Sequence, residues 1–289
     1  MIPVAFDYEA PGSVDEALRL LAEAADGGRE TAVLAGGQSL LPVLRMRLAA
    51  PDLVVDLGRV PELRGVREEG DELVIGAMTT HDDVVREPLV RRHALLLSLA
   101  AQTVADPQVR HRGTFGGALT HADPAGDLPA PALALGARFV IAGPAGRRTV
   151  EAADFFRDLF TTAIEDGEVL VAVRVPRHTG WGARYEKFSL VAQAWSIVGV
   201  AATVRLVGDS IAQARVALTH LGPVPVRATA VEEALAGRPA TAEVIREAAS
   251  HAADGTSPPA DAQADEDYRR HLATVLTGRA VRAAAGVPA

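Results

Sequence analysis

Two glycine-rich segments contain the residue types that could hold a phosphorylated ligand. Residues 34–42 have the sequence LAGGQSLLP, and residues 112–118 have the sequence RGTFGGA. A glycine pair between a strand and a helix lets the backbone turn tightly and come close to a ligand. Free backbone N–H groups at such a turn favour a phosphate. Neither segment has the spacing of a Walker loop or of a dinucleotide-binding fingerprint.

Polar residues in and after the second segment could complete such a site. Thr114 offers a hydroxyl, and Asp123 and Asp127 offer carboxylates. Two glycine loops from distant parts of the chain could clamp a pyrophosphate from both sides, with Asp127 accepting a hydrogen bond from a ribose or ribityl hydroxyl. The residues alone leave a plainer alternative open, in which both segments are turns and the aspartates cap neighbouring helices.

Other kinds of reactive site have little support. His121, Asp123 and Asp127 together match no specific metal geometry, and the chain has no Gly-x-Ser-x-Gly nucleophile turn. We therefore expect no metal site and no catalytic residue on this chain. The remaining histidines are scattered and are interpreted mostly as solvated or capping residues: His81, His93, His111, His178, His220, His251 and His271.

The composition narrows the class of protein. The chain has 289 residues, no cysteine and a formal net charge of −8. Without cysteine it holds no disulfide, no cysteine-ligated zinc and no iron–sulfur cluster of its own. The negative charge is opposite to that of most nucleic-acid-binding proteins. The apolar stretches are shorter than the roughly 20 residues of a membrane helix, and the N-terminus lacks a signal-peptide pattern. We expect a cytoplasmic protein with no transmembrane segment and no nucleic-acid partner.

The elements that must position the two loops form three parts. Residues 1–58 are expected to form a small α/β unit, with strands at 31–35 and 53–57 on either side of a helix at 39–49. Within residues 59–177 the patterns predict a hairpin around Gly70 and Asp71, mostly helix over 79–105, an irregular segment over 106–131, and strands at 138–142 and 168–175. Within residues 178–289 they predict a hairpin of 196–207 with 211–221 and helices near 227–236, 241–252 and 265–284.

The two loops, their order and their separation resemble the FAD-binding medium subunit of molybdenum hydroxylases. This family includes the aerobic carbon monoxide, nicotine and xanthine dehydrogenases, and the resemblance covers nearly the whole chain. The matching segments include FDY at 6–8, AGGQSLLP at 35–42, DPQVRHRGTFGG at 106–117, HADPAGDLP at 121–129, YEKF at 185–188 and DYRRHL at 267–272. The resemblance implies an α+β protein. A two-part FAD-binding fold of the PCMH type would span 1–58 and 59–177, and a C-terminal α+β domain over 178–289, an antiparallel sheet with helices, would pack near the flavin.

The resemblance also implies which residues bind FAD. The first loop would bind the diphosphate through its backbone amides, and the second would form the opposite wall. Asp127 would bind a ribityl or ribose hydroxyl, Lys187 would reach the polar edge of the flavin ring, and Leu170 would pack on the ring; Val104 would also touch the cofactor. The implied contacts are Leu34, Ala35, Gly36, Gly37, Gln38, Ser39, Leu40, Leu41, Thr114, Phe115, Gly116, Gly117, Ala118, Asp127, Leu170, Lys187 and Trp195.

Three positions depart from the family's pattern. Phe115 replaces the usual isoleucine or valine, and Asp106 stands where a histidine is common. Trp195 stands where relatives often carry a tyrosine, so it could either stack on the flavin or serve as a core aromatic. If both glycine doublets approach the ligand with their backbones, Gly37→Val or Gly116→Val should abolish FAD binding and leave the fold largely intact.

The resemblance implies an electron-transfer role. In such enzymes a large subunit oxidises the substrate at a molybdenum cofactor and a small subunit carries iron–sulfur clusters. The medium subunit passes the electrons through FAD to an external acceptor, either a small molecule or a protein. The cysteine-free chain fits the medium subunit, since the clusters must then belong to a partner. Two alternatives remain open: a self-contained FAD oxidoreductase, and a non-redox module that binds another phosphorylated ligand.

Overall fold

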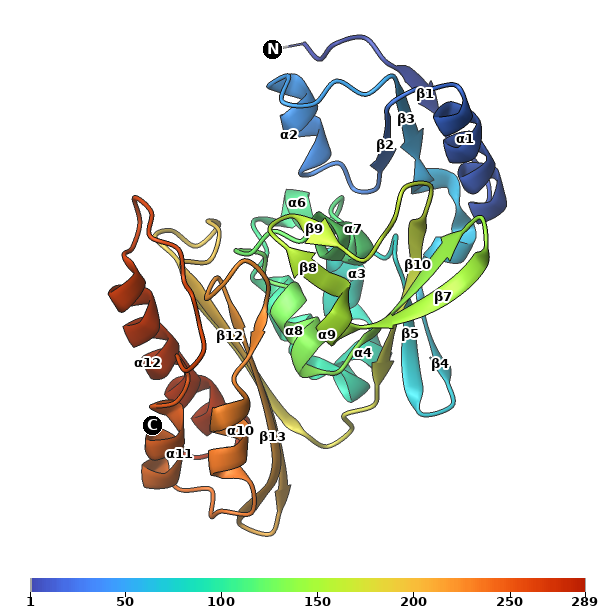
Figure 1. The fold of residues 1–289 in the computed structure, drawn as a ribbon. Helices are drawn as coiled ribbons and strands as arrows, with labels where there is room; N and C mark the ends of the chain where they lie inside the picture. Colours follow the sequence, from blue (N-terminus) through green and yellow to red (C-terminus); the bar gives the residue numbers. More distant parts are fainter. Residues whose placement is uncertain (1, 289) are drawn as a thin grey trace.

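The N-terminal part of the molecule is a small parallel sheet covered by one long helix. The structure, a computed structural model, describes residues 2–288. The sheet has the order β1-β3-β2, from β1 (Asp7–Glu9), β2 (Thr31–Leu34) and β3 (Leu53–Asp56). Helix α1 (Val14–Asp26) begins at Ser13, whose hydroxyl accepts a hydrogen bond from the Glu16 amide, the usual arrangement at a helix start. Helix α2 (Leu40–Arg45) follows the first glycine loop (Figure 1).

The middle part is a five-stranded antiparallel sheet with short helices packed on it. Its strand order is β4-β5-β10-β6-β7, and β8 pairs with β9 in a separate small hairpin. The strands are β4 (Val66–Glu69), β5 (Glu72–Gly76), β6 (Arg138–Gly143), β7 (Gly146–Glu151), β8 (Phe156–Asp158), β9 (Thr161–Thr162) and β10 (Val169–Pro176). The helices are α3 (His81–Arg86), α4 (Pro88–His93), α5 (Leu95–Gln102), α6 (Pro107–Arg110), α7 (Phe115–His121), α8 (Pro129–Ala134) and α9 (Ala152–Phe155). Two single-turn 3₁₀ helices, Leu57–Arg59 and Pro61–Leu63, connect this part to the first.

The C-terminal part is an antiparallel sheet with helices on one face. The sheet order is β11-β12-β13-β14, from β11 (Gly182–Phe188), β12 (Val198–Val207), β13 (Ser210–Thr219) and β14 (Val226–Arg227). Helices α10 (Thr229–Leu235), α11 (Ala242–Ala249) and α12 (Glu266–Ala284) complete it. These layers confirm the predicted α+β class, including the hairpins at Gly70-Asp71 and Gly208-Asp209.

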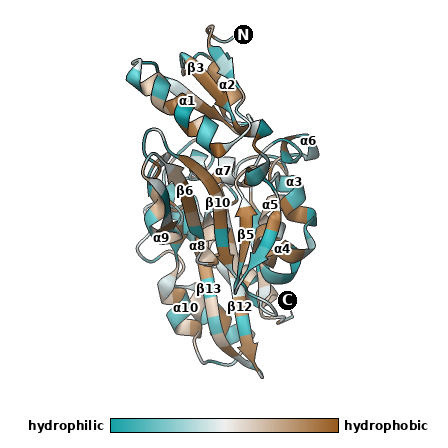
Figure 2. Ribbon diagram, turned by 90° about the vertical axis from the view of Figure 1, so that its right-hand side faces the viewer, coloured by the Kyte–Doolittle hydropathy of each residue, from teal (hydrophilic) through white to brown (hydrophobic). Residues whose placement is uncertain are grey.

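The apolar cores join the parts of the chain. Figure 2 shows that β5, β10 and β12 are largely hydrophobic. The N-terminal core takes in Met78 and Val169 from the middle part, and the middle core takes in Tyr185 and Ala201 from the C-terminal part. Buried contacts therefore cross both predicted domain boundaries, after residue 58 and after residue 177. The division of the chain into three domains at these residues remains a prediction.

Two local predictions differ from the structure. The helix expected over 39–49 ends at Arg45, and Ser39 makes no side-chain capping bond; Arg47, at φ 59°, turns the chain out of the helical path. The segment 106–131, expected to be irregular, contains α6, α7 and the start of α8. Asp106 caps α6 and Thr114 caps α7, so these short helices are stabilised at their first turns. Pro107 is at the first position of α6, where proline is tolerated, whereas the glycines of α7 disfavour helix.

Among the described helices, none has the length and apolar character needed to cross a membrane.

Candidate functional site

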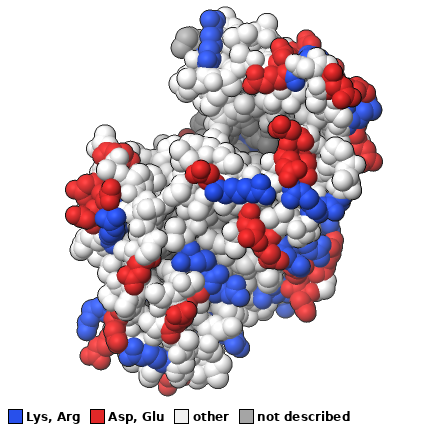
Figure 3. Space-filling view, in the orientation of Figure 1, with Lys and Arg blue, Asp and Glu red and all other residues white. Residues whose placement is uncertain are grey.

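The two glycine loops meet at a cavity of about 540 Å³. It opens below the N-terminal part, where the molecule is hollowed in Figure 3. Its walls come from the first loop, from α7 and the segment before it, from 126–128, from Lys187 on β11 and from the loop 193–195. The volume falls within the range of about 300–1,000 Å³ that is typical of small-molecule and cofactor sites.

The first loop presents a row of free backbone donors. Within residues 2–288, no acceptor pairs with the backbone N–H of Gly36, Gly37, Gln38, Ser39 or Leu40. The Gln38 side chain donates to the Gly36 carbonyl at 3.2 Å, and Gly37 adopts φ +77°, a conformation that glycine adopts without strain. Successive unpaired N–H groups in a tight turn form a concave site for an anion.

The second loop lies directly against the first. A Cβ on Gly36 would collide with the Arg112 carbonyl and lie 2.7 Å from the Gly113 Cα. A Cβ on Gly117 would lie 3.2 Å from the Ala35 Cβ. Glycine is therefore required at position 36 for the two backbones to pack, and the predicted convergence of the doublets is confirmed.

The glycine doublet of the second loop does not offer the free amides that the sequence led us to expect; within residues 112–118 of the described chain, only the Thr114 amide has no acceptor. The Phe115 amide donates to the Thr79 carbonyl at 2.8 Å and the Gly116 amide to the Ala77 carbonyl at 2.8 Å. The Gly117 amide donates to the Thr114 hydroxyl at 3.2 Å. The expectation of a clamp with free amides on both sides is therefore wrong for this glycine doublet, and the second loop forms a wall.

Gly116 has a packing role that the sequence did not reveal. A Cβ there would lie 2.5 Å from the Ala77 Cβ and 2.7 Å from the Ala77 Cα. The expectation that Gly116→Val leaves the fold largely intact is wrong for this reason: a larger side chain forces the start of α7 away from the strand end at Ala77.

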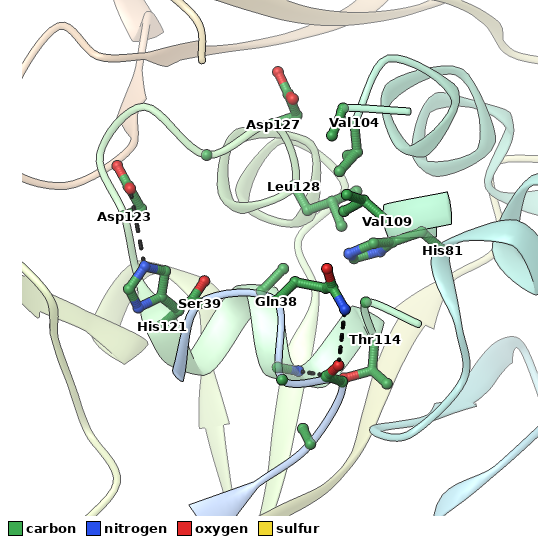
Figure 4. Close-up of a pocket in the computed structure, with 18 of the residues that line it drawn as sticks. Gln38, Ser39, His81, Val104, Val109, Thr114, His121, Asp123, Asp127 and Leu128 are labelled. Atoms are coloured by element: carbon green, nitrogen blue, oxygen red, sulfur yellow. Dashed lines mark hydrogen bonds and ion pairs between the residues drawn. The ribbon is translucent and has the colours of Figure 1, made fainter. Parts of the chain in front are cut away.

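A buried charged cluster is centred on Asp127, which lies on the side of the cavity away from Gln38 and Ser39 of the first loop (Figure 4). The Asp127 carboxylate accepts hydrogen bonds from Lys187 Nζ at 2.7 Å, from the Tyr185 hydroxyl at 2.9 Å and from the Ser196 hydroxyl at 2.8 Å. Lys187 Nζ also donates to the Thr103 carbonyl at 3.2 Å. Burial raises the pKa of Asp127, and the Lys187 ammonium opposes that effect. Burial also raises the pKa of Tyr185 well above its usual value, so Tyr185 stays a donor.

The predicted contact residues fall into two groups. Lining the cavity are Ala35, Gly36, Gly37, Gln38, Ser39, Leu40, Val104, Thr114, Gly117, Ala118, Asp127, Lys187 and Trp195. Outside its lining are Leu34, Leu41, Phe115, Gly116 and Leu170. Leu170 is buried in the middle core on β10, and Phe115 is fully buried there as well. Trp195 is 55% exposed and is therefore no core aromatic.

His81 lines the same cavity, although its sequence context gave no sign of it. The residue is only 4% exposed, and burial, together with nearby Arg110, lowers its pKa to about 4. His81 is therefore an exception to the interpretation of most scattered histidines as solvated or capping. Thr80 caps α3 and thus places His81 in the first helical turn, and the His81 ring packs closely against the remote residue Gly113.

The arrangement of possible metal ligands can be stated for the described residues. Among residues 2–288, no group of three or more histidine and carboxylate side chains is arranged to hold an ion. His121 and Asp123 approach only to 3.9 Å.

Two family descriptions match the chain in succession. Residues 4–178 match the FAD binding domain in molybdopterin dehydrogenase. Residues 183–284 match the CO dehydrogenase flavoprotein C-terminal domain.

Similar proteins cover the chain from end to end. The carbon monoxide dehydrogenase medium chain of Hydrogenophaga pseudoflava is 42% identical, with 98% of both chains covered. The glyceraldehyde dehydrogenase medium chain of Sulfolobus acidocaldarius is 34% identical, covering 98% of this chain and 99% of that one. Among solved structures, carbon monoxide dehydrogenase from Hydrogenophaga pseudoflava superposes with a TM-score of 0.94 at 44% identity and 98% coverage of both chains. Quinoline 2-oxidoreductase from Pseudomonas putida 86 superposes with a TM-score of 0.93 at 34% identity and 99% coverage of both.

Proposed function

The chain belongs to the family of FAD-binding medium subunits of molybdenum hydroxylases, and from this premise we propose that it relays electrons from the iron–sulfur clusters of a partner subunit to an external acceptor. The observation that carries the proposal is the row of unpaired amides from Gly36 to Leu40, which faces the same cavity as the Asp127–Lys187 pair. FAD suits both groups, because its anionic diphosphate can accept hydrogen bonds from the amides and its polar flavin ring can contact the Asp127–Lys187 pair.

The first loop is the proposed seat of the FAD diphosphate. Its five N–H groups have no partner among the described residues, and a hydrogen bond to a charged acceptor contributes about 1.5–3 kcal/mol. Gly36 and Gly113 keep the two backbones in contact, so the loop is held in place before the ligand arrives. The second loop then contributes shape through Thr114, Gly117 and Ala118.

The charged cluster retains hydrogen-bonding capacity for the cofactor. Tyr185 and Ser196 both donate to Asp127 Oδ1, whereas Lys187 alone donates to Oδ2. A carboxylate oxygen accepts about two hydrogen bonds, and an ammonium donates three. One acceptor position on Oδ2 and one N–H of Lys187 are therefore available, which fits a cofactor hydroxyl at Asp127 and an electron-rich ring edge at Lys187.

Bound FAD would supply a carrier that exchanges electrons singly or in pairs, while the protein supplies placement and electrostatic tuning. The chain's own residues hold the cofactor and exclude water, and a positive charge at Lys187 favours an electron-rich ring beside it. No residue of this chain is proposed to act as an acid or a base.

The proposed partners are a large subunit with a molybdenum cofactor and a small iron–sulfur subunit. The chain has no cysteine, so thiolate-bound clusters must be carried by another chain. The similar carbon monoxide and glyceraldehyde dehydrogenase proteins are both named medium chains, which supports a multisubunit assembly. The acceptor, a small molecule or a protein, would collect electrons at the flavin.

The experiment that tests the diphosphate site compares two matched glycine variants. Gly37 (φ +77°) and Gly70 (φ +58°) are both in the left-handed region, and an alanine there costs each a similar backbone strain of about 1–2 kcal/mol. A Cβ at Gly37 would in addition lie 3.0 Å from Leu41 Cδ1, the end of a flexible side chain that has to move slightly. Gly70 lies in the β4–β5 turn, and a Cβ there meets nothing within 4 Å. We expect Gly37→Ala to weaken FAD binding at least about tenfold, measured by quenching of flavin fluorescence, and Gly70→Ala to bind FAD as the wild type does.

Two results would contradict the proposal. A folded wild-type chain that stays colourless after incubation with FAD would rule out a flavoprotein. Equal FAD affinity of Gly37→Ala and Gly70→Ala would place the diphosphate away from the first loop.

A further inference from the structure

The start of helix α3 is joined to the second glycine loop. The His81 amide donates to the Gly113 carbonyl at 2.9 Å, and Thr80 forms an isolated antiparallel bridge with Thr114. Thr80 also caps α3, accepting a hydrogen bond from the Asp83 amide at 3.1 Å. The backbone of His81 is therefore fixed by contacts on both sides.

Gly113 lies between the imidazole of His81 and the first loop, whose amides at residues 36–40 are unpaired. A Cβ on Gly113 would lie 2.8 Å from His81 Cδ2 and 2.9 Å from Nε2, so only a glycine lets the ring take this position. Gly113 in turn touches Gly36 at the first loop. Figure 4 shows the His81 and Gln38 side chains directed toward the same space.

The hydrogen-bonding capacity of this ring is not met by the protein. Nδ1 is buried and has no partner in the described chain. The lowered pKa of His81, about 4, means that the ring is neutral near pH 7 and carries one proton. A buried N–H without a partner is rarer in proteins than a buried acceptor without one, which favours the proton on Nε2, the nitrogen beside Gly113.

We propose that His81 is a cofactor-binding residue that donates a hydrogen bond from Nε2 to a diphosphate oxygen of FAD. The amides of the second loop's glycine doublet are engaged in the fold, and His81 supplies a side-chain donor on that side of the bridge. The first loop then binds one side of the FAD diphosphate through its backbone amides, and the His81 side chain binds the other side. This inference rests on the proposed placement of the diphosphate at residues 36–40.

The test compares FAD binding in two variants of His81 and one control. Loss of a hydrogen bond to a charged group is expected to raise the FAD dissociation constant of His81→Leu about tenfold. His81→Gln keeps an amide donor and should bind FAD more tightly than His81→Leu. His93→Leu is the control, because His93 is also a buried histidine, bonded through Nδ1 to Thr179 at 2.6 Å, but lies outside the cavity lining. It should bind FAD as the wild type does.

The phosphorus NMR spectrum of bound FAD separates contact from indirect effects. The resonances of the two phosphorus atoms should shift between wild type and His81→Gln and stay in place in His93→Leu. Unchanged resonances in His81→Gln, or unchanged affinity in His81→Leu, would overturn the assignment. If His81→Leu does not fold, His81→Gln decides by both measurements. A wild type that binds no FAD would instead refute the proposed function, so the two failures are distinguishable.

Discussion

At the scale of single residues, one buried ion pair forms part of the cavity wall. The side chains of Lys187 and Asp127 are 7% and 4% exposed, so each charge relies on the other and on nearby hydroxyls for its solvation. Such a pair is costly to form but more costly to break, because the remaining charge stays in the interior. We infer that this pair fixes the floor of the cavity as much as it offers contacts to a ligand.

Replacing Asp127 with asparagine is therefore expected to destabilise the fold. The change leaves Lys187 buried without a counter-charge, which should lower the free energy of unfolding in urea by about 3–5 kcal/mol. Asp123→Asn is the matched control: Asp123 lines the same cavity, and its hydrogen bond from the Ala125 amide can be kept by an asparagine. Equal stability of the two variants would show that Lys187 finds water or another partner.

At the scale of elements, the two glycine loops are alike in sequence and different in bonding. The strand end at Ala77 and the turn at Thr79 lie beside the start of α7 and accept the amides of Gly116 and Phe115. No described segment does the same for the first loop, where α2 begins one residue after Ser39. We therefore infer that the amides of the first loop are available to a ligand, whereas the glycine doublet of the second loop is part of the scaffold.

Amide hydrogen exchange should report this difference directly. Adding FAD is expected to slow exchange strongly in a peptide covering residues 36–40, because these N–H groups gain acceptors. Exchange at Phe115 and Gly116 should change much less, since their N–H groups are bonded already. Mass spectrometry on the chain with and without FAD gives the comparison. Equal slowing in both loops would mean that the second loop rearranges to bind the cofactor.

At the scale of the whole molecule, a chain of contacts links the C-terminal helix to the cavity. Arg269 on α12 is fully buried and donates to the Ile197 carbonyl and, at 2.6 Å, to Asp261. Ile197 follows Ser196, whose hydroxyl donates to Asp127. The third part of the chain thus holds the end of the loop that carries Trp195.

Removing the Arg269 guanidinium should loosen this connection. We expect Arg269→Met to lower the free energy of unfolding by about 2 kcal/mol, because the buried Ile197 carbonyl loses its donor. Arg270→Met is a suitable control on the same helix, since Arg270 makes only exposed ion pairs with Glu266 and Asp267, which contribute less than about 1 kcal/mol. Urea unfolding of both variants provides the measurement. A larger loss in Arg270→Met would mean that the buried link is not what holds the loop.

The sequence by itself was sufficient to predict turns and loops, which depend on residues close to one another in the chain. Gly70-Asp71 marked one hairpin, the patterns of 196–207 and 211–221 marked another, and the glycine doublets marked the two loops, because turns are stabilised by residues a few positions apart. The family resemblance, which the comparisons confirm, rested on the same local motifs.

Only the tertiary structure decided which of these groups remain available to a ligand. Whether an amide is free depends on an acceptor from a remote segment, as Ala77 and Thr79 show for the second loop. The pairing of Asp127 with Lys187 joins residues 60 positions apart, and the His81 ring packs closely against Gly113. Hydrogen bonding and desolvation act over a few ångströms in space. The pattern of residues adjacent in sequence does not specify which distant groups the fold brings within that range.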